Sequence, residues 1–167
     1  VVFLTETVYG LGANAFNEDA VKKIYEAKGR PSDNPLIVHV CDKEQIKSLV
    51  SKISDQAQKL IDAFMPGPIT VIMPKAKNIP SIVTGGLDTV GVRMPIHEVA
   101  REFIKECGCP IAAPSANVST HISPTNAEDV YEDMKGRIKL IIDGGSCSVG
   151  IESTIVDTTS NIPTILR

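Results

Sequence analysis

Apolar and polar positions alternate along the chain with two different periods. A helical period begins after Asn17, runs to Lys28 and stops at Gly29. We expect further helices over residues 43–50, 55–64 behind a Ser54 cap, 97–107 before Gly108, and 127–134. Short apolar runs predict strands over residues 36–40, 69–73, 89–93, 110–113, 138–143, 153–157 and 164–167. The interleaving of the two periods predicts an α/β fold.

The strand pattern also indicates the type of sheet. Leu140, Ile141 and Ile142 form a continuous apolar run, which is typical of a sheet covered on both faces. The last expected strands follow one another without helices between them, so a mixed sheet fits better than a purely parallel one. Connections rich in Pro and Gly lie at residues 65–68, 84–87, 114–125 and 144–150, and long loops in a compact domain usually serve a function.

Length and composition predict one soluble domain, because 167 residues with 43% apolar and 22% charged side chains suffice for a single core. No apolar run reaches the roughly 18 residues that a membrane span needs, so we expect a cytoplasmic protein. The chain opens inside an apolar run and ends on Arg167 without a polar tail. We therefore expect a domain over residues 1–167 that is trimmed at its N-terminus and lacks a possible C-terminal domain.

Charge and cysteine content exclude two classes of function. A formal net charge of −3 argues against a protein that coats nucleic acid, since that role needs an excess of cations. The four cysteines lack paired CxxC spacing, and Cys107-Gly-Cys109 has no histidine partners, so we expect reduced thiols and no metal ligand set.

Residues 10–15 read Gly-Leu-Gly-Ala-Asn-Ala, which fits the GxGxxA pattern of dinucleotide-binding loops. In such loops the glycines open directly onto the helix that holds the pyrophosphate. Here the helix cap is Asn17, several residues downstream. The spacing therefore favours a glycine-rich turn.

Cationic residues at two places suit anionic ligands. Lys28 and Arg30 flank a helix-ending glycine, and this pair suits phosphate oxygens, although it could equally complement the helix C-terminus. Arg93 lies among apolar residues in an expected strand, where it needs either a protein carboxylate or an anionic ligand as a partner.

Hydroxyl-rich loops are further candidates. Ser115, Asn117 and Ser123 lie in a loop of small residues, where they suit a nucleotide or, equally, form Asx and Ser turns. Ser153 lacks the GxSxG context of a serine hydrolase. Asp143 and Glu152 are compatible with magnesium, but two carboxylates are too common to carry weight.

Eight segments occur together in one order along the chain: TETVYGLG, KGRPSDNPL, PGPIT, VGVRMP, APSAN, SPT, DGG and GIESTIVD. Each is weak alone, but their succession is specific, and the chain resembles the YrdC-like family of L-threonylcarbamoyladenylate synthases. Two departures concern loop conformation: Leu4 stands where the family usually has proline, and Thr120 stands where glycine commonly follows.

The resemblance implies a YrdC-like twisted mixed sheet with flanking helices and a concave basic ligand surface. It implies a nucleotidyltransferase that makes L-threonylcarbamoyl-AMP and pyrophosphate from L-threonine, bicarbonate and ATP, with Mg²⁺ bound through the ATP phosphates. A downstream tRNA threonylcarbamoyl transferase would complete the threonylcarbamoyl-adenosine modification of tRNA, and we expect neither direct tRNA binding nor membrane association.

Site residues follow from the positions that match the family's motifs. The threonine positions are Thr7, His39, Arg93, Ala113 and Ser153. The ATP positions are Arg30, Asn34, Thr89, Ser115, Asn117, Ser123 and Arg167, and the catalytic cations are Lys28 and Arg30. No residue is assigned to a metal.

Two alternatives remain open at this point. One is the carbamoyl-adenylate-handling domain of hydrogenase-maturation carbamoyltransferases, which resembles this family and would not need threonine. The other is an RNA-binding module, against which stand the acidic balance and a content of only three Tyr and four Phe.

Overall fold

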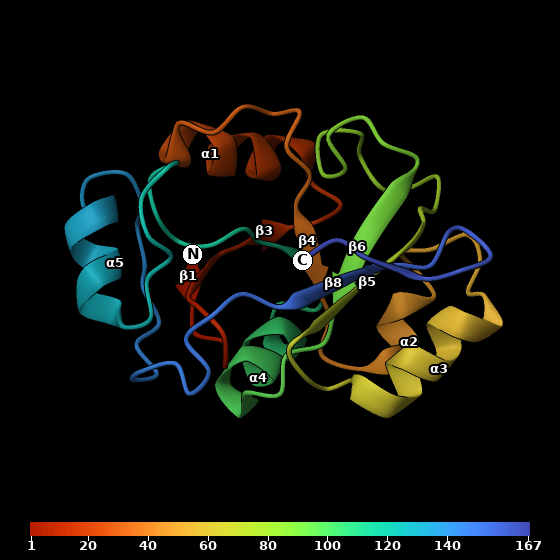
Figure 1. Ribbon diagram of the computed structural model, residues 1–167. Coiled ribbons are helices and arrows are strands. Elements are labelled where there is room, and N and C mark those ends of the chain that lie inside the picture. The colour runs from red at the N-terminus through yellow and green to blue at the C-terminus, as the bar shows by residue number, and fades with distance from the viewer.

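The computed structural model describes residues 1–167 and has the expected α/β character (Figure 1). Its helices are α1 Glu18–Lys28, α2 Lys43–Ile46, α3 Asp55–Phe64, α4 Glu98–Glu106 and α5 Ala127–Met134. Its strands are β1 Val2–Phe3, β2 Gly10–Leu11, β3 Ala13–Asn14, β4 Ile37–His39, β5 Ile69–Pro74, β6 Thr89–Arg93, β7 Ile111–Ala112, β8 Thr154–Asp157 and β9 Thr164–Ile165. No helix has the length and apolar character required to cross a membrane.

Helix ends follow the local signals in the sequence. The Asn17 side chain accepts a hydrogen bond from the Ala20 amide, and Ser54 caps α3 in the same way through Ala57. At the other end of α1, Gly29 adopts a left-handed backbone conformation with φ of 61°, which glycine tolerates without a Cβ penalty. These local caps explain why α1 and α3 begin and end where the sequence predicts.

Seven strands form one mixed sheet in the order β3-β7-β4-β6-β5-β8-β9, and β1 pairs with β2 in a separate ribbon. The pairs β4·β6 and β5·β8 are parallel, whereas β5·β6 and the outer pairs are antiparallel. The expectation of a mixed sheet is confirmed. The central pairing brings His39 of β4 opposite Arg93 of β6.

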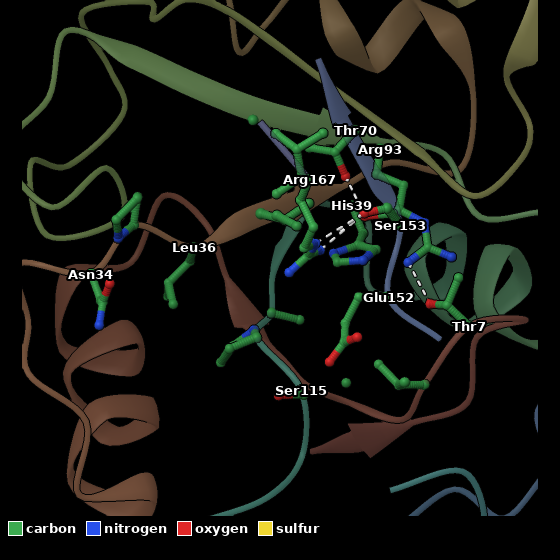
Figure 2. Close-up of a pocket in the computed structure, with 18 of the residues that line it drawn as sticks. Thr7, Asn34, Leu36, His39, Thr70, Arg93, Ser115, Glu152, Ser153 and Arg167 are labelled. Carbon is green, nitrogen blue, oxygen red and sulfur yellow. Dashed lines mark hydrogen bonds between the residues drawn. The ribbon is translucent and has the colours of Figure 1, made fainter. Parts of the chain in front are cut away.

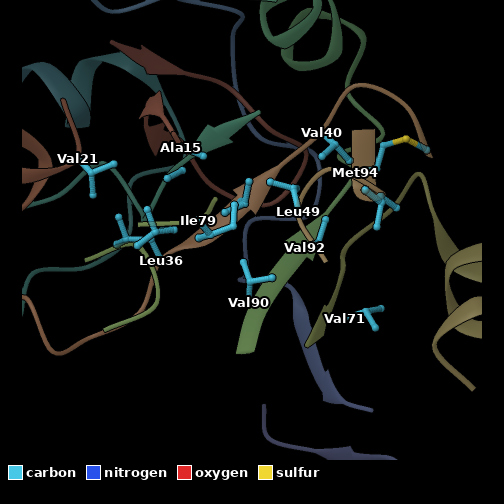
Figure 3. Packing of buried hydrophobic residues seen from close by; sticks show 14 of the residues in the cluster. Ala15, Val21, Leu36, Val40, Leu49, Val71, Ile79, Val90, Val92 and Met94 are labelled. Atoms are coloured by element: carbon cyan, nitrogen blue, oxygen red, sulfur yellow. The ribbon is translucent and has the colours of Figure 1, made fainter. Parts of the chain in front are cut away.

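The pleat of the sheet separates a core face from an opposite face that carries several polar side chains, here called the polar face. On the core face, Val38, Val71 and Val92 are fully buried in one apolar cluster (Figure 3). Ile46 of α2 and Ile61 of α3 belong to the same cluster, so these helices close that side of the sheet. Along each strand, the residues directly before and after these valines project to the opposite face.

Two expected elements differ from the structure. The predicted helix over 43–50 stops at Ile46, because the Leu49 amide bonds to the Ile46 carbonyl in a tight turn. The predicted strand over 138–143 is wrong. Only Ile141 bridges Val2, because β1 is two residues long, and Leu140 is 53% exposed.

The expected glycine-rich turn over residues 10–15 is also wrong, because most of this segment forms two short strands. Gly10 belongs to β2, and β3 begins at Ala13. Gly12 lies between them, where a Cβ would come within 2.7 Å of the Ile111 side chain and 2.9 Å of the Phe3 ring. Glycine is therefore required here by close packing, and α1 begins too far downstream for a dinucleotide loop.

Candidate functional site

A cavity of about 330 Å³ lies on the polar face of the sheet (Figure 2). Alternate residues of the central strands form its floor: Ile37 and His39 of β4, Thr70 and Ile72 of β5, and Thr89, Gly91 and Arg93 of β6. Its walls come from loops, and the lining residues from them include Thr5, Thr7, Val8, Pro114, Ser115, Glu152 and Ser153. The period-two alternation of the strands thus places polar side chains in one hollow.

Arg93 is held by the protein itself. Its Nη1 donates to the Thr7 hydroxyl at 2.8 Å, and its Nη2 lies 2.7 Å from Glu6 Oε1. The contact with Glu6 is an ion pair without hydrogen-bond alignment, and Arg93 Nε has no partner. Arg93 and Glu6 are 3% and 1% exposed, so the carboxylate compensates a charge that would be costly to bury alone.

Of the two partners open for Arg93, the structure therefore supplies the protein carboxylate. Burial lowers the pKa of Arg93, and the Glu6 carboxylate opposes that shift. A guanidinium has five N–H donors, and Thr7 and Glu6 engage one nitrogen each. Arg93 also lines the cavity, and its Nε makes no hydrogen bond within the protein.

His39 belongs to the floor of the cavity and is only 4% exposed. The Phe3 ring packs edge-on against it, with ring centroids 5.8 Å apart. Burial, assisted by the positive charge of Arg93, lowers the pKa of His39 to about 3. His39 is thus a neutral imidazole at physiological pH, and its Nδ1 lacks a hydrogen-bond partner.

Ser153 connects three parts of the chain. Its hydroxyl pairs with the Thr70 hydroxyl at 2.8 Å, and its carbonyl accepts two bonds from the Arg167 guanidinium at 3.2 and 3.1 Å. Figure 2 shows Arg167 reaching Ser153 next to Thr70, and the antiparallel pairing of β9 with β8 brings the end of the chain to this part of the sheet. Thr70, which is 1% exposed, is a cavity residue that the sequence reasoning missed, although the alternation along 69–73 points it to this face.

The other end of the cavity is formed by Arg30, Asn34, Thr89 and Ser115. The Arg30 Nη2 makes one long bond of 3.4 Å to the Pro35 carbonyl, and its Nε has no partner. The lining holds three arginines and one carboxylate, that of Glu152, and with Arg93 paired to Glu6 the positive charges of Arg30 and Arg167 still exceed that one negative charge. This imbalance suits an anionic ligand.

Comparison with known proteins gives the family. A model of the Sua5, YciO and YrdC family, described as "Telomere recombination", matches residues 1–167. The chain belongs to this family. It is 54% identical to the threonylcarbamoyl-AMP synthase of Pyrococcus abyssi and 55% identical to that of Bacillus subtilis, in each case over its whole length and 49% of the relative. The chain therefore spans about half the length of these relatives.

Solved structures share the fold. The chain matches P. abyssi Sua5 complexed with L-threonine with a TM-score of 0.98 and 54% identity, covering 99% of this chain and 49% of that one. It also matches full-length HypF in its phosphate- and nucleotide-bound form with a TM-score of 0.84. At 22% identity, over 99% of this chain and 26% of HypF, that second match concerns the fold alone.

Most site positions expected from the Sua5/YrdC family motifs meet in this one cavity. All five threonine positions and five ATP positions line it: Thr7, His39, Arg93, Ala113 and Ser153, with Arg30, Asn34, Thr89, Ser115 and Arg167. Glu6 was missed, because nothing local indicates that a residue next to Thr7 reaches Arg93 of a distant strand. Thr5 was missed too; its hydroxyl lies 3.0 Å from that of Thr7.

Three expected site residues lie outside the cavity lining. The Lys28 ammonium donates to the Ser115 and Asn117 carbonyls, so of the expected pair of cations only Arg30 lines the cavity. The Asn117 amide donates to backbone carbonyls of its own loop. Ser123 donates to Glu152 at 2.7 Å and so adjoins the cavity through that carboxylate.

Proposed function

We propose that this chain is the catalytic domain of a threonylcarbamoyl-AMP synthase, a nucleotidyltransferase that joins L-threonine, bicarbonate and ATP. The observation that carries the proposal is that the positions expected to bind threonine and those expected to bind ATP line a single cavity. The likeness to a Sua5 structure complexed with L-threonine supports the threonine end.

The threonine end offers complementary groups. Arg93 has donors for the carboxylate of the amino acid, and Thr7 fixes the guanidinium in place. His39 and Ser153 offer neutral polar groups for the hydroxyl and amine, in a buried setting where an unmatched polar group is costly. L-Valine, which has the shape of threonine without its hydroxyl, should therefore bind less well.

The chemistry needs positioning more than a protein nucleophile. The threonine amine attacks the bicarbonate carbon, water leaves, and a carbamate results. A carbamate oxygen then attacks the α-phosphorus of ATP, the bond from that phosphorus to the bridging oxygen breaks, and pyrophosphate leaves. Arg30 and Arg167 would stabilise the phosphate charge, while Arg93 holds the attacking molecule in line.

Magnesium fits this cavity only as a companion of ATP. No cluster of three or more acidic, His or Cys side chains is present, and Glu152 is the single carboxylate in the lining. Mg²⁺ commonly uses one or two carboxylates together with substrate phosphates, so Glu152 is the residue that would hold it. The ion would add positive charge at the phosphates.

The test is pyrophosphate release with each substrate omitted in turn. We expect release to require ATP, L-threonine and bicarbonate together, and to fall strongly when L-valine replaces L-threonine. Release without threonine would contradict the proposal and favour the carbamoyl-adenylate alternative. Product transfer to tRNA by a separate threonylcarbamoyl transferase is part of the same proposal.

A further inference from the structure

Lys28, the last residue of α1, has a buried ammonium group that touches only one loop. The side chain is 1% exposed, and its Nζ donates to the Ser115 carbonyl at 2.5 Å, the Asn117 carbonyl at 2.5 Å and Asn117 Oδ1 at 3.3 Å. An ammonium has three protons, and three oxygens of the loop surround it. No donor is left for a ligand unless these bonds break.

The loop over residues 115–121 is fixed from several sides. Asn117 Nδ2 donates to the Val118 and His121 carbonyls, and Asp133 of α5 accepts from the Val118 amide at 2.6 Å. The Ser119 amide bonds back to the Lys28 carbonyl at 2.9 Å. The backbone at the C-terminus of α1 and its side-chain ammonium therefore hold the same loop.

Ser115 stands at the point where this loop meets the cavity. Its carbonyl is bound by Lys28, its backbone bridges Gly10, and the residue lines the cavity. Arg30, two residues after Lys28, lines the same end and has an unpartnered Nε. Arg30 thus faces the cavity, whereas Lys28 faces the loop over residues 115–121.

We propose that Lys28 is a positioning residue, which holds the Ser115 and Asn117 carbonyls and so sets Ser115 for the nucleotide, while Arg30 contacts the ligand. This inference deepens the proposed function and rests on it. Burial lowers the pKa of Lys28 to about 8, so the amine is mostly protonated at neutral pH. Hydrogen bonds from a charged donor are stronger than neutral ones, which suits the ammonium to fixing a loop.

The test compares Lys28→Met with Arg30→Met and with Lys23→Met, an exposed lysine of the same helix. ATP affinity is measured by calorimetry, and hydrogen exchange is measured on the ligand-free protein. We expect Lys28→Met to weaken ATP binding about tenfold or more, as loss of one or two charged hydrogen bonds implies. It should also accelerate exchange in residues 115–121 and leave other segments unchanged.

The controls separate positioning from contact. Arg30→Met should weaken ATP binding without faster exchange in the loop, and Lys23→Met should change neither readout. The double variant Lys28→Met, Ser115→Ala should bind ATP about as weakly as whichever single variant binds it less tightly. The two changes should not add, because Lys28 acts on ATP only through the position of Ser115. If Lys28→Met does not fold, Asn117→Ala opens the same loop and should reproduce both effects.

Three results would overturn the inference. If Lys28→Met weakens ATP binding but leaves hydrogen exchange in the loop unchanged, Lys28 contacts the ligand. If ATP affinity and loop exchange are both unchanged, Lys28 neither contacts ATP nor holds the loop. Faster exchange throughout the protein would mean a general structural role. If the unsubstituted protein failed to bind ATP, the proposed function would fail, whereas the exchange comparison would still decide whether Lys28 holds the loop.

Discussion

At the scale of single residues, the site depends on buried groups whose charges are set by their neighbours. Arg93 stays inside the protein because Glu6 lies 2.7 Å away, and His39 is neutral because burial and Arg93 both oppose its protonation. Glu6, Arg93 and His39 are all buried. The substrate would thus meet side chains that are oriented before it arrives.

Replacing Glu6 should expose the cost of the buried arginine. Glu6→Gln leaves the Arg93 charge without its counterion, and breaking a buried pair costs about 3–5 kcal/mol. We expect a loss of that order in the free energy of unfolding measured by urea denaturation. Glu26→Gln, at an exposed position of α1, should cost almost nothing. Equal, small losses in both variants would show that the pair contributes no stability.

His39 should make stability depend on pH. Its folded pKa of about 3 lies below the ordinary 6.5, so the unfolded chain takes up the proton first as the pH falls. The stability is complete above 6.5 and is lost progressively toward pH 3. Between pH 6.5 and about 5, the free energy of unfolding should fall by about 1.5 kcal/mol more in the unsubstituted protein than in His39→Asn. Parallel pH curves would contradict the assignment of a neutral histidine.

Sequence reasoning identified many cavity positions but could not supply their partners. Arg93 was recognised as needing a partner, yet Glu6 is distant in sequence and reaches it only through the fold. Lys28 was expected at the phosphates because a pair of cations beside a helix-ending glycine suits phosphate oxygens, whereas packing of the 115–121 loop buries it. Partners made by tertiary packing leave no local signal.

At the scale of elements, local chemistry decided what could be foreseen. Helices α3 and α5 match their predicted ranges because Ser54 and Asn126 cap them locally. The predicted strand at 138–143 failed because a strand needs a partner of matching length, and β1 offers only two residues. Strands β2 and β3 were missed because Gly10 in β2 and Gly12 between the two strands resemble a glycine-rich turn.

The β1–β2 ribbon depends on close packing at Gly12. Gly12→Ala would bring a Cβ within 2.7 Å of Ile111, and such overpacking usually costs about 1–3 kcal/mol. Gly10→Ala is the matched control, because its Cβ would meet its neighbours at 3.4 Å, an ordinary contact. In thermal or urea unfolding, the Gly12→Ala variant should have a clearly lower free energy of unfolding than the Gly10→Ala variant. The reverse order would mean that the Phe3 and Ile111 side chains move aside freely.

At the scale of the whole molecule, the seven-stranded sheet creates one shared cavity. Core packing against α2 and α3 takes one face, which leaves alternate residues of β4, β5 and β6 free to form a polar floor on the other. The Sua5/YrdC family resemblance indicated which residues gather there, and the fold shows that a single pleated surface brings them together. A shared cavity is what an adenylation between two substrates requires.

The most direct measurement is the mass spectrum of the product formed from isotopically labelled bicarbonate, L-threonine and ATP. The proposed function predicts a threonylcarbamoyl-AMP that carries the label and forms together with pyrophosphate. It also predicts that no such product forms when threonine is omitted. An adenylate that lacks the threonine moiety, or that forms equally well without threonine, would contradict it.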